Sequence, residues 1–286
     1  MKLKLIGKSL LYLSLIINCS CSNKQKIRKG DILQYDLTRP NQHYYLPYEL
    51  QEVSGLTYVN DSIVAMVQDE NGILYFFNLN QKKVTRKLEF AKDGDFEGIE
   101  FANDTAYAMK SNGDIIRFGL NSRERPQIIE TPLSSKNDVE GLGYDRDINS
   151  LIIACKESPN IKNTDFKGKA IYLFDLDESQ FIYRPICIEK SHIIEYLKLN
   201  SMDIHFNEFR PSAIASHPNL KDYYILSHGG KLLISVNKEE KITGIEKLNE
   251  SLFFQPEGIC FAPNGDMFIA NEGGKVRSTL LKFSLK

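Results

Sequence analysis

Short apolar runs alternate with polar turns along most of the chain, and five of these runs match one another. Each matching segment is strand-like and carries Ser or Glu directly after its first apolar residue. The five segments are EVSGLTY from Glu52, FEGIEF from Phe96, VEGLGY from Val139, PSAIAS from Pro211 and PEGICF from Pro256. Two further apolar runs, separated by a polar turn, follow each segment. The pattern predicts a repeated unit of three or four short strands.

The spacing of the repeats indicates the architecture. Equivalent Ser or Glu positions are 43, 43, 72 and 45 residues apart. A repeat of about 45 residues with three or four strands has the size of a β-propeller blade. No Pro-, Gly- or Ser-rich linker interrupts residues 46–286. We therefore expect an all-β fold, a single β-propeller domain over residues 30–286, with five blades favoured over six.

Two parts of the chain do not fit the simple repeat. The long 72-residue interval contains residues 190–200, where Ile193, Ile194 and Leu197 lie on one face of a helix. This segment is expected to be a small helical insertion. The last repeat has room for only three strands before the chain ends, so a strand around Asp31 to Leu37 is expected to supply the fourth and close the ring.

Glycine-containing turns divide the predicted strands. Asn71-Gly72 and Asn112-Gly113 are expected to form tight hairpin turns, because Asn and Gly adopt positive φ at low cost. Gly229-Gly230 and Gly273-Gly274 are expected to serve the same hairpin through a longer loop. The glycines inside four of the matching segments, at positions 55, 98, 141 and 258, are typical of close approach between backbones.

Composition and charge narrow the range of partners. The chain has 286 residues, of which 42% are hydrophobic, and its 36 Lys and Arg nearly balance its 37 Asp and Glu. This is ordinary globular usage, with no excess positive charge to bind a phosphate backbone. A nucleic-acid partner is therefore not expected, and we expect a monomer.

The first residues are typical of a targeting segment. Lys2, Lys4 and Lys8 precede a short apolar run from Ser9 to Ile17, and Cys19 and Cys21 follow. This order predicts a lipoprotein-type signal peptide over residues 1–18, lipidation of Cys19 rather than Cys21, and a polar tether over residues 19–29. A plain signal peptide with incidental cysteines is the alternative. The expected location is the bacterial cell envelope, on the periplasmic or outward-facing side of a membrane that holds the lipid anchor.

The equivalent position of the five segments is the main candidate site. The five residues at this position, one from each blade, should form a ring around the central channel: Ser54, Glu97, Glu140, Ser212 and Glu257. Three converging carboxylates repel one another unless a cation or protons neutralise them. Hard oxygen ligands suit calcium, so we predict that Glu97, Glu140 and Glu257 bind this ion. The alternative is a structural clasp, in which these side chains accept hydrogen bonds from neighbouring strands.

A second ring is predicted at the ends of the second strands. Its members are charged or titratable residues beside the turns: Asp69, Lys110, Glu157, His228 and Glu272. Lys110 and Lys156 would pair with the carboxylates or bind an anionic group of a ligand. Charged turn residues are also commonly just solvated, and that alternative stays open.

The five segments together with QPEGICFAPNGDMFIANE near the C-terminus resemble the SdiA-regulated family of exported bacterial β-propeller proteins. The resemblance covers residues 48–283 and implies a propeller in an extracytoplasmic location, with no settled activity. Such propellers are more distantly similar to calcium-dependent lactonases and esterase-like phytases, which bind metal at the mouth of the channel. This chain departs from the pattern in PSAIAS, which lacks both Glu and Gly, and in EVSGLTY, which has Ser in place of Glu.

Two classes of function remain open. The first is a binding protein that recognises a small molecule, glycan or protein through its channel or faces. The second is a calcium-dependent hydrolase, a lactonase, esterase or phosphoesterase, that acts at the channel mouth. The ring holds Glu and Ser where lactonases mix Glu, Asn and Asp, and the sequence carries none of the common hydrolase motifs. Binding is therefore favoured over catalysis.

Overall fold

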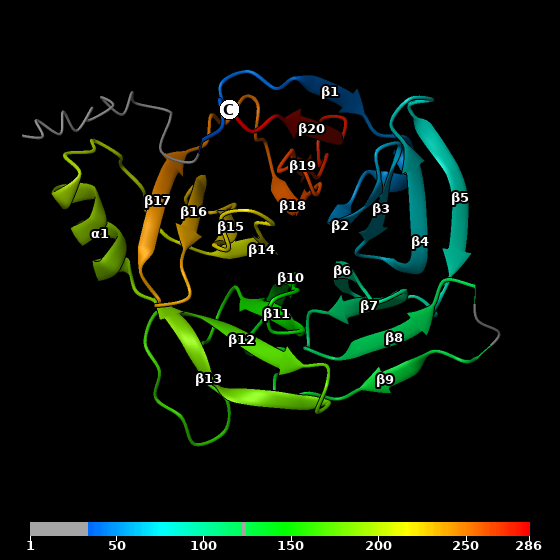
Figure 1. Cartoon of the computed structure of the whole chain (residues 1–286), viewed down its shortest axis with the longest axis horizontal. Helices are drawn as coiled ribbons and strands as arrows, with labels where there is room; N and C mark the ends of the chain where they lie inside the picture. The colour runs from blue at the N-terminus through cyan, green and yellow to red at the C-terminus, as the bar shows by residue number, and fades with distance from the viewer. Residues whose placement is uncertain (1–33, 122–123) are drawn as a thin grey trace, which may run out of the picture.

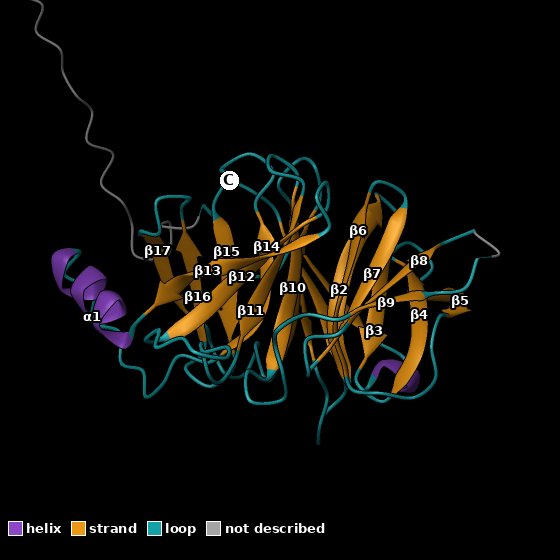
Figure 2. Cartoon of the chain, turned by 90° about the horizontal axis from the view of Figure 1, so that it is seen from below, coloured by secondary structure: helices purple, strands orange, loops and turns teal. Residues whose placement is uncertain are grey.

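The computed structural model describes residues 34–121 and 124–286, and these residues form a five-bladed β-propeller. Five four-stranded antiparallel sheets are arranged in a ring around the axis of the predicted central channel (Figure 1). The strands run between two faces, and loops cover both faces (Figure 2). The predicted signal peptide, the tether and Cys19 lie outside the described residues.

The first two blades follow the predicted repeat closely. Blade 1 consists of β2 (Val53–Asn60), β3 (Ile63–Gln68), β4 (Asn71–Asn78) and β5 (Lys83–Glu89). Blade 2 consists of β6 (Phe96–Ala102), β7 (Thr105–Lys110), β8 (Ile115–Gly119) and β9 (Gln127–Ile129).

The next two blades flank the insertion. Blade 3 consists of β10 (Val139–Asp145), β11 (Ser150–Cys155), β12 (Lys169–Asp175) and β13 (Gln180–Ile188). Blade 4 consists of β14 (Pro211–Ser216), β15 (Tyr223–Ser227), β16 (Leu232–Val236) and β17 (Ile242–Lys247).

Blade 5 joins the two ends of the described chain. It consists of β18 (Pro256–Phe261), β19 (Met267–Asn271), β20 (Thr279–Phe283) and, as its outermost strand, β1 (Gln42–Tyr45). The ring is therefore closed by an N-terminal strand, as expected, but the strand lies later than residues 31–37. Residues 34–37 form no strand because Tyr35 is buried between blades 4 and 5, where its hydroxyl donates to the Gly265 carbonyl oxygen at 2.5 Å. A 3₁₀ turn, η1 (Tyr48–Leu50), leads from β1 into blade 1.

The helical insertion is confirmed. Helix α1 (Lys190–Leu199) lies at the periphery beside β17 (Figure 1). Ile193 and Leu197 are buried in the core between blades 3 and 4. Ile194, which was expected on the same face, is 37% exposed. Among the described residues, no helix is both long and apolar enough to cross a bilayer.

The core is divided into five hydrophobic clusters, one in each gap between neighbouring blades. Each sheet is covered on both faces, so middle strands such as β11 and β19 are buried along their whole length. The outer strand β5 is mostly exposed and polar. Blades approach most closely at the inner-strand glycines. A Cβ atom on Gly98 would lie 2.5 Å from the Cβ atom of Leu142 in the next blade.

The turn predictions have mixed outcomes. Asn112-Gly113 lies in the β7–β8 turn as expected, but only Gly113 has a positive φ, at +88°. The two Gly-Gly pairs lie in longer loops, as expected. The prediction for Asn71-Gly72 is wrong, because residues 69 and 70 make the turn and Asn71 already pairs with Gln68. Gly72 serves a close approach instead, since a Cβ there would lie 2.5 Å from the Ala91 carbonyl oxygen.

Candidate functional site

A bulge at the start of every inner strand shapes one end of the channel. In all five blades the pairing of the inner strand with its neighbour shifts by one residue, between Val53 and Gly55 in β2 and at the equivalent points of the others. The residues left unpaired are the predicted ring: Ser54, Glu97, Glu140, Ser212 and Glu257. A bulge changes the direction of the side chain of its extra residue. The bulge in each repeat therefore orients the ring residues differently from the other residues of the inner strands.

The ring opens into a charged cavity of about 610 Å³, here called the acidic end. Ser54, Glu97, Glu140 and Glu257 line it. The remaining acidic side chains that line it are Glu52, Asp69, Glu208, Glu250 and Glu272. The basic ones are Lys156, Arg210 and Lys231, with His228 beside them. Negative groups therefore outnumber positive ones, and none of the described Phe and Tyr residues lines this cavity.

The three ring carboxyls influence one another strongly. Burial, followed by the Glu140 charge, raises the pKa of Glu97 to about 10. Burial and the Glu257 charge raise the pKa of Glu140 to about 8, although Lys156 opposes the shift. Burial raises the pKa of Glu257 to about 8. At neutral pH, protons and neighbouring cations therefore keep this cluster from carrying its full negative charge.

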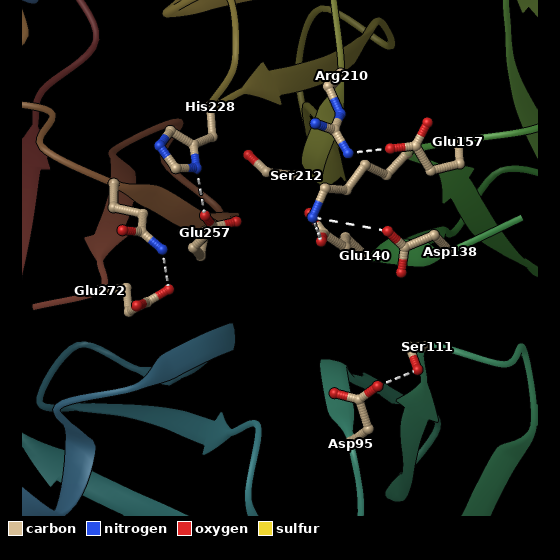
Figure 3. Close-up of polar contacts among 12 residues, drawn as sticks. Asp95, Ser111, Asp138, Glu140, Glu157, Arg210, Ser212, His228, Glu257 and Glu272 are labelled. Carbon is tan, nitrogen blue, oxygen red and sulfur yellow. Dashed lines mark hydrogen bonds and ion pairs between the residues drawn. The ribbon is translucent and has the colours of Figure 1, made fainter. Parts of the chain in front are cut away.

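Positive side chains gather on the side of blades 3 and 4 (Figure 3). The Lys156 ammonium contacts Glu140 and lies 3.7 Å from Asp138. The Arg210 guanidinium, from blade 4, contacts Glu157 of blade 3. Glu157 is therefore held at the blade interface and does not line the cavity.

On the side of blade 5, the carboxyls contact neutral polar side chains where those on the side of blade 3 contact cations (Figure 3). His228 Nδ1 lies 3.0 Å from Glu257 Oε1, and the Gln255 amide donates to Glu272. Burial lowers the pKa of His228 to about 4, so its imidazole is neutral at pH 7 and the contact is not an ion pair. Burial and Glu52 raise the pKa of Glu272 to about 8.

The two serines of the ring join neighbouring blades. Ser54 Oγ donates to the Phe96 carbonyl oxygen at 2.6 Å, and Ser212 Oγ donates to the Pro256 carbonyl oxygen at 2.7 Å. Both side chains are buried. The two hydroxyls therefore join blades as donors, which differs from the predicted clasp, in which Glu97, Glu140 and Glu257 accept hydrogen bonds from neighbouring strands.

The second predicted ring is only partly assembled. Asp69, His228 and Glu272 line the cavity. Lys110 does not, because its ammonium lies 5.3 Å from the centre of the Phe96 ring. Lys156, one residue before Glu157, supplies the cation at this level.

The structure also shows a polar position that sequence reasoning missed. The residue two before each ring member is polar in all five blades: Glu52, Asp95, Asp138, Arg210 and Gln255. Three of them contact the end of the second strand in their own blade, as the Asp95 carboxylate does with Ser111 (Figure 3). Their polarity at a constant offset from the repeat was the signal that could have identified them.

The fit to a metal ion is incomplete. Among residues 34–121 and 124–286, no group of three or more His, Cys, Asp and Glu side chains stands ready to hold a metal. The donor chemistry nevertheless suits calcium, since carboxylate oxygens dominate. Asp69 Oδ1 is also buried without a hydrogen-bond partner, and burial and Glu52 raise the pKa of this carboxyl to about 6. Such an oxygen is a suitable ligand for a cation.

Comparisons with known proteins agree on the fold. No curated protein matches the sequence. Glutaminyl cyclase of Myxococcus xanthus has a similar structure, with a TM-score of 0.59 and 11% identity over 87% of this chain and 96% of that one. A luciferin-regenerating enzyme has a TM-score of 0.50 and 10% identity over 86% of this chain and 95% of that one. At such identities the likeness shows the propeller alone.

Two further observations come from a structure of unknown function and from a family of sequences. A protein of unknown function from Bacteroides thetaiotaomicron matches with a TM-score of 0.52 and 12% identity over 82% of this chain and 56% of that one. The family model described as SdiA-regulated matches residues 46–275, a span that contains all five inner strands. The chain therefore belongs to the SdiA-regulated family of β-propellers.

Proposed function

We propose that this protein is a ligand-binding propeller whose acidic end takes a positively charged ligand, with calcium or a similar divalent cation as the smallest occupant. The observation that carries the proposal is the set of five bulges, which brings three carboxyls of raised pKa into one cavity. Asp69 Oδ1, which is buried without a hydrogen-bond partner, adds a further oxygen ligand for a cation. The ion would be held by Glu97, Glu257 and Asp69, because Glu140 is already paired with the Lys156 ammonium.

Calcium should stabilise the protein against heat, since an ion that binds only the folded state adds RT ln(1 + [L]/Kd) to its stability. At a hundredfold excess over Kd this amounts to about 2.7 kcal/mol. The test compares melting curves in calcium and in a chelator for the wild type, Glu97→Gln and Glu195→Gln. Glu195 is an exposed residue of α1 and serves as the control. We expect Glu97→Gln alone to reduce the calcium response; identical wild-type curves in calcium and chelator would reject the ion.

A calcium-dependent hydrolase is the second candidate, and His228 favours it. This half-exposed neutral imidazole lines the cavity and is oriented by Glu257, as a general base requires. A screen against lactones, aryl esters and phosphate esters separates the two readings. Turnover that is lost in His228→Gln would support catalysis, whereas binding without turnover supports the first proposal.

We further propose that the protein is exported and held at a bacterial membrane through lipid on Cys19. The family resemblance and the order of residues 1–21 support this location. Labelled palmitate should be incorporated into the wild type and lost when Cys19 and Cys21 are both replaced by Ala. Single replacements would identify which cysteine carries the lipid.

A further inference from the structure

The opposite end of the channel contains a second and larger cavity. Its volume is about 940 Å³, within the range of small-molecule sites, and it lies where the inner strands end and turn back. Four partly buried aromatic side chains line it: Tyr58, Phe101, Tyr144 and Phe261. We call it the aromatic end.

One carboxyl stands among these rings. Glu100 lies three residues after Glu97 on β6, and the equivalent residues of the other blades are uncharged: Thr57, Gly143, Ala215 and Cys260. Thr57 Oγ1 donates to Glu100 Oε1 at 2.5 Å, and the Phe101 amide donates to the same oxygen at 2.8 Å. None of the hydrogen bonds among the described residues uses Oε2, and this atom is not one of the buried atoms without a partner. Oε2 is therefore left for a ligand.

The other charged groups around this cavity are largely paired. Asp145 accepts from Tyr223 and contacts Lys238, and Lys221 lies 2.7 Å from Asp147. Glu100, Asp104 and Arg146 take part in none of the ion pairs found in the described part of the chain. Two negative groups and one positive group remain, so the cavity has an excess of one negative charge when Glu100 is ionised. The positive group is Arg146, whose charge favours the ionised form of Glu100.

We propose that the aromatic end binds a small organic amine, whose ammonium group donates to Glu100 and whose apolar or aromatic body packs against the surrounding rings. A carboxylate supplies the counter-charge, and aromatic faces attract a cation directly. Burial raises the pKa of Glu100 to about 7, so at neutral pH the carboxyl is only partly ionised, and a bound ammonium would favour its charged form. The acidic end offers charge without aromatic walls, so the two cavities select different cations.

Three probes separate charge from apolar contact: phenethylamine, its neutral analogue 2-phenylethanol, and ethylamine, which lacks the ring. Titration calorimetry on the purified protein should show that phenethylamine binds about tenfold or more tightly than either of the other two. The alcohol cannot form the charge-assisted hydrogen bond, and ethylamine cannot contact the aromatic walls. Equal affinity for the alcohol, or no binding of phenethylamine, would overturn the proposal.

Two matched substitutions on β6 locate the site. Glu100→Gln keeps the shape and an acceptor for Thr57, and it should abolish the preference for the amine over the alcohol. Glu97→Gln changes the same strand at the acidic end and should leave that preference intact. The reverse result would assign the amine to the acidic end and refute the inference.

A wall residue provides a test that does not depend on Glu100. Tyr144→Leu should weaken phenethylamine binding several-fold while leaving ethylamine unchanged, because only the former uses the aromatic wall. A melting curve of each variant identifies loss of fold. Unchanged phenethylamine affinity in a folded Tyr144→Leu protein would contradict the proposed contact.

Discussion

The two ends of the channel are built from the same five inner strands but differ in how their carboxyl groups are surrounded. At the acidic end, many carboxyls crowd together, and protons, Lys156 and hydrogen bonds reduce their repulsion. At the aromatic end, Glu100 stands among rings and accepts hydrogen bonds from one hydroxyl and one amide. The difference shows that three residues of separation on one inner strand are enough to change the electrostatic environment completely.

The largest expected effect is loss of the folded propeller, and with it both ends of the channel. Gly98→Val should destabilise the protein by about 3 kcal/mol or more, because its Cβ would meet Leu142 in the next blade and both β-branches would add to the clash. The expected result is a strong loss of soluble protein or a fall in Tm of about 6–12 °C. Ala213→Gly, at the equivalent position of blade 4, should cost only about 1 kcal/mol. A stable Gly98→Val protein would contradict the close approach of blades 2 and 3.

Removing the cation of the acidic end should be the next largest effect. Lys156→Met leaves Glu140 and Asp138 without their partner, and we expect a loss of about 2–3 kcal/mol in a denaturant titration. The double variant Lys156→Met, Glu140→Gln should recover much of this loss. Additive effects of the two substitutions would show that the pair is not coupled.

The pH dependence of stability should distinguish the two ends. The raised pKa of Glu97, Glu140 and Glu257 means that the folded state retains protons that the unfolded chain, with carboxyl pKa values near 4.5, has released. Their stabilising contribution is complete below pH 4.5 and is lost as the pH rises through 8 and beyond. Between pH 7 and 8.5 the calcium-free protein should lose a few degrees of Tm per pH unit.

Substitutions of Glu97 and Glu100, the carboxyls at the two ends of β6, show which end causes the pH dependence of Tm. Glu97→Gln should flatten the slope between pH 7 and 8.5. Glu100→Gln should not, because the pKa of Glu100 is about 7 and its contribution is lost mainly below this window. A slope that responds to Glu100 and not to Glu97 would reverse the assignment.

The smallest expected effect concerns the serine clasps of the acidic end. Ser54→Ala or Ser212→Ala removes one buried hydrogen bond between blades and should cost about 1 kcal/mol, measured by thermal melting. Ligand binding at the aromatic end should be unchanged. A loss of more than about 3 kcal/mol would indicate that these hydroxyls do more than join two blades.

The sequence predicted the parts of this fold that depend on repetition. The register of the five segments put the five ring residues at equivalent positions, and each lies at the bulge of its inner strand. The long interval identified α1. It could not place Asn71-Gly72, because Gly is required both for tight turns and for close packing, and only the position of Ala91 distinguishes the two. The sequence predicted that Lys156 pairs with carboxylates, and the structure identifies Glu140 and Asp138 as its partners. The aromatic end was out of reach, since it depends on which side chains meet across blades.

The closure of the ring has a consequence for how the chain folds. Within residues 34–121 and 124–286, β1 pairs with β20 alone, and the register joins Gln42 to Lys282 and Tyr45 to Thr279. A chain that emerges N-terminus first cannot form this pairing until almost all of it has appeared, and the loop it closes spans nearly the whole domain. Blade 5 is therefore completed last, and a chain truncated before residue 279 would leave two strand edges open to pairing with other molecules.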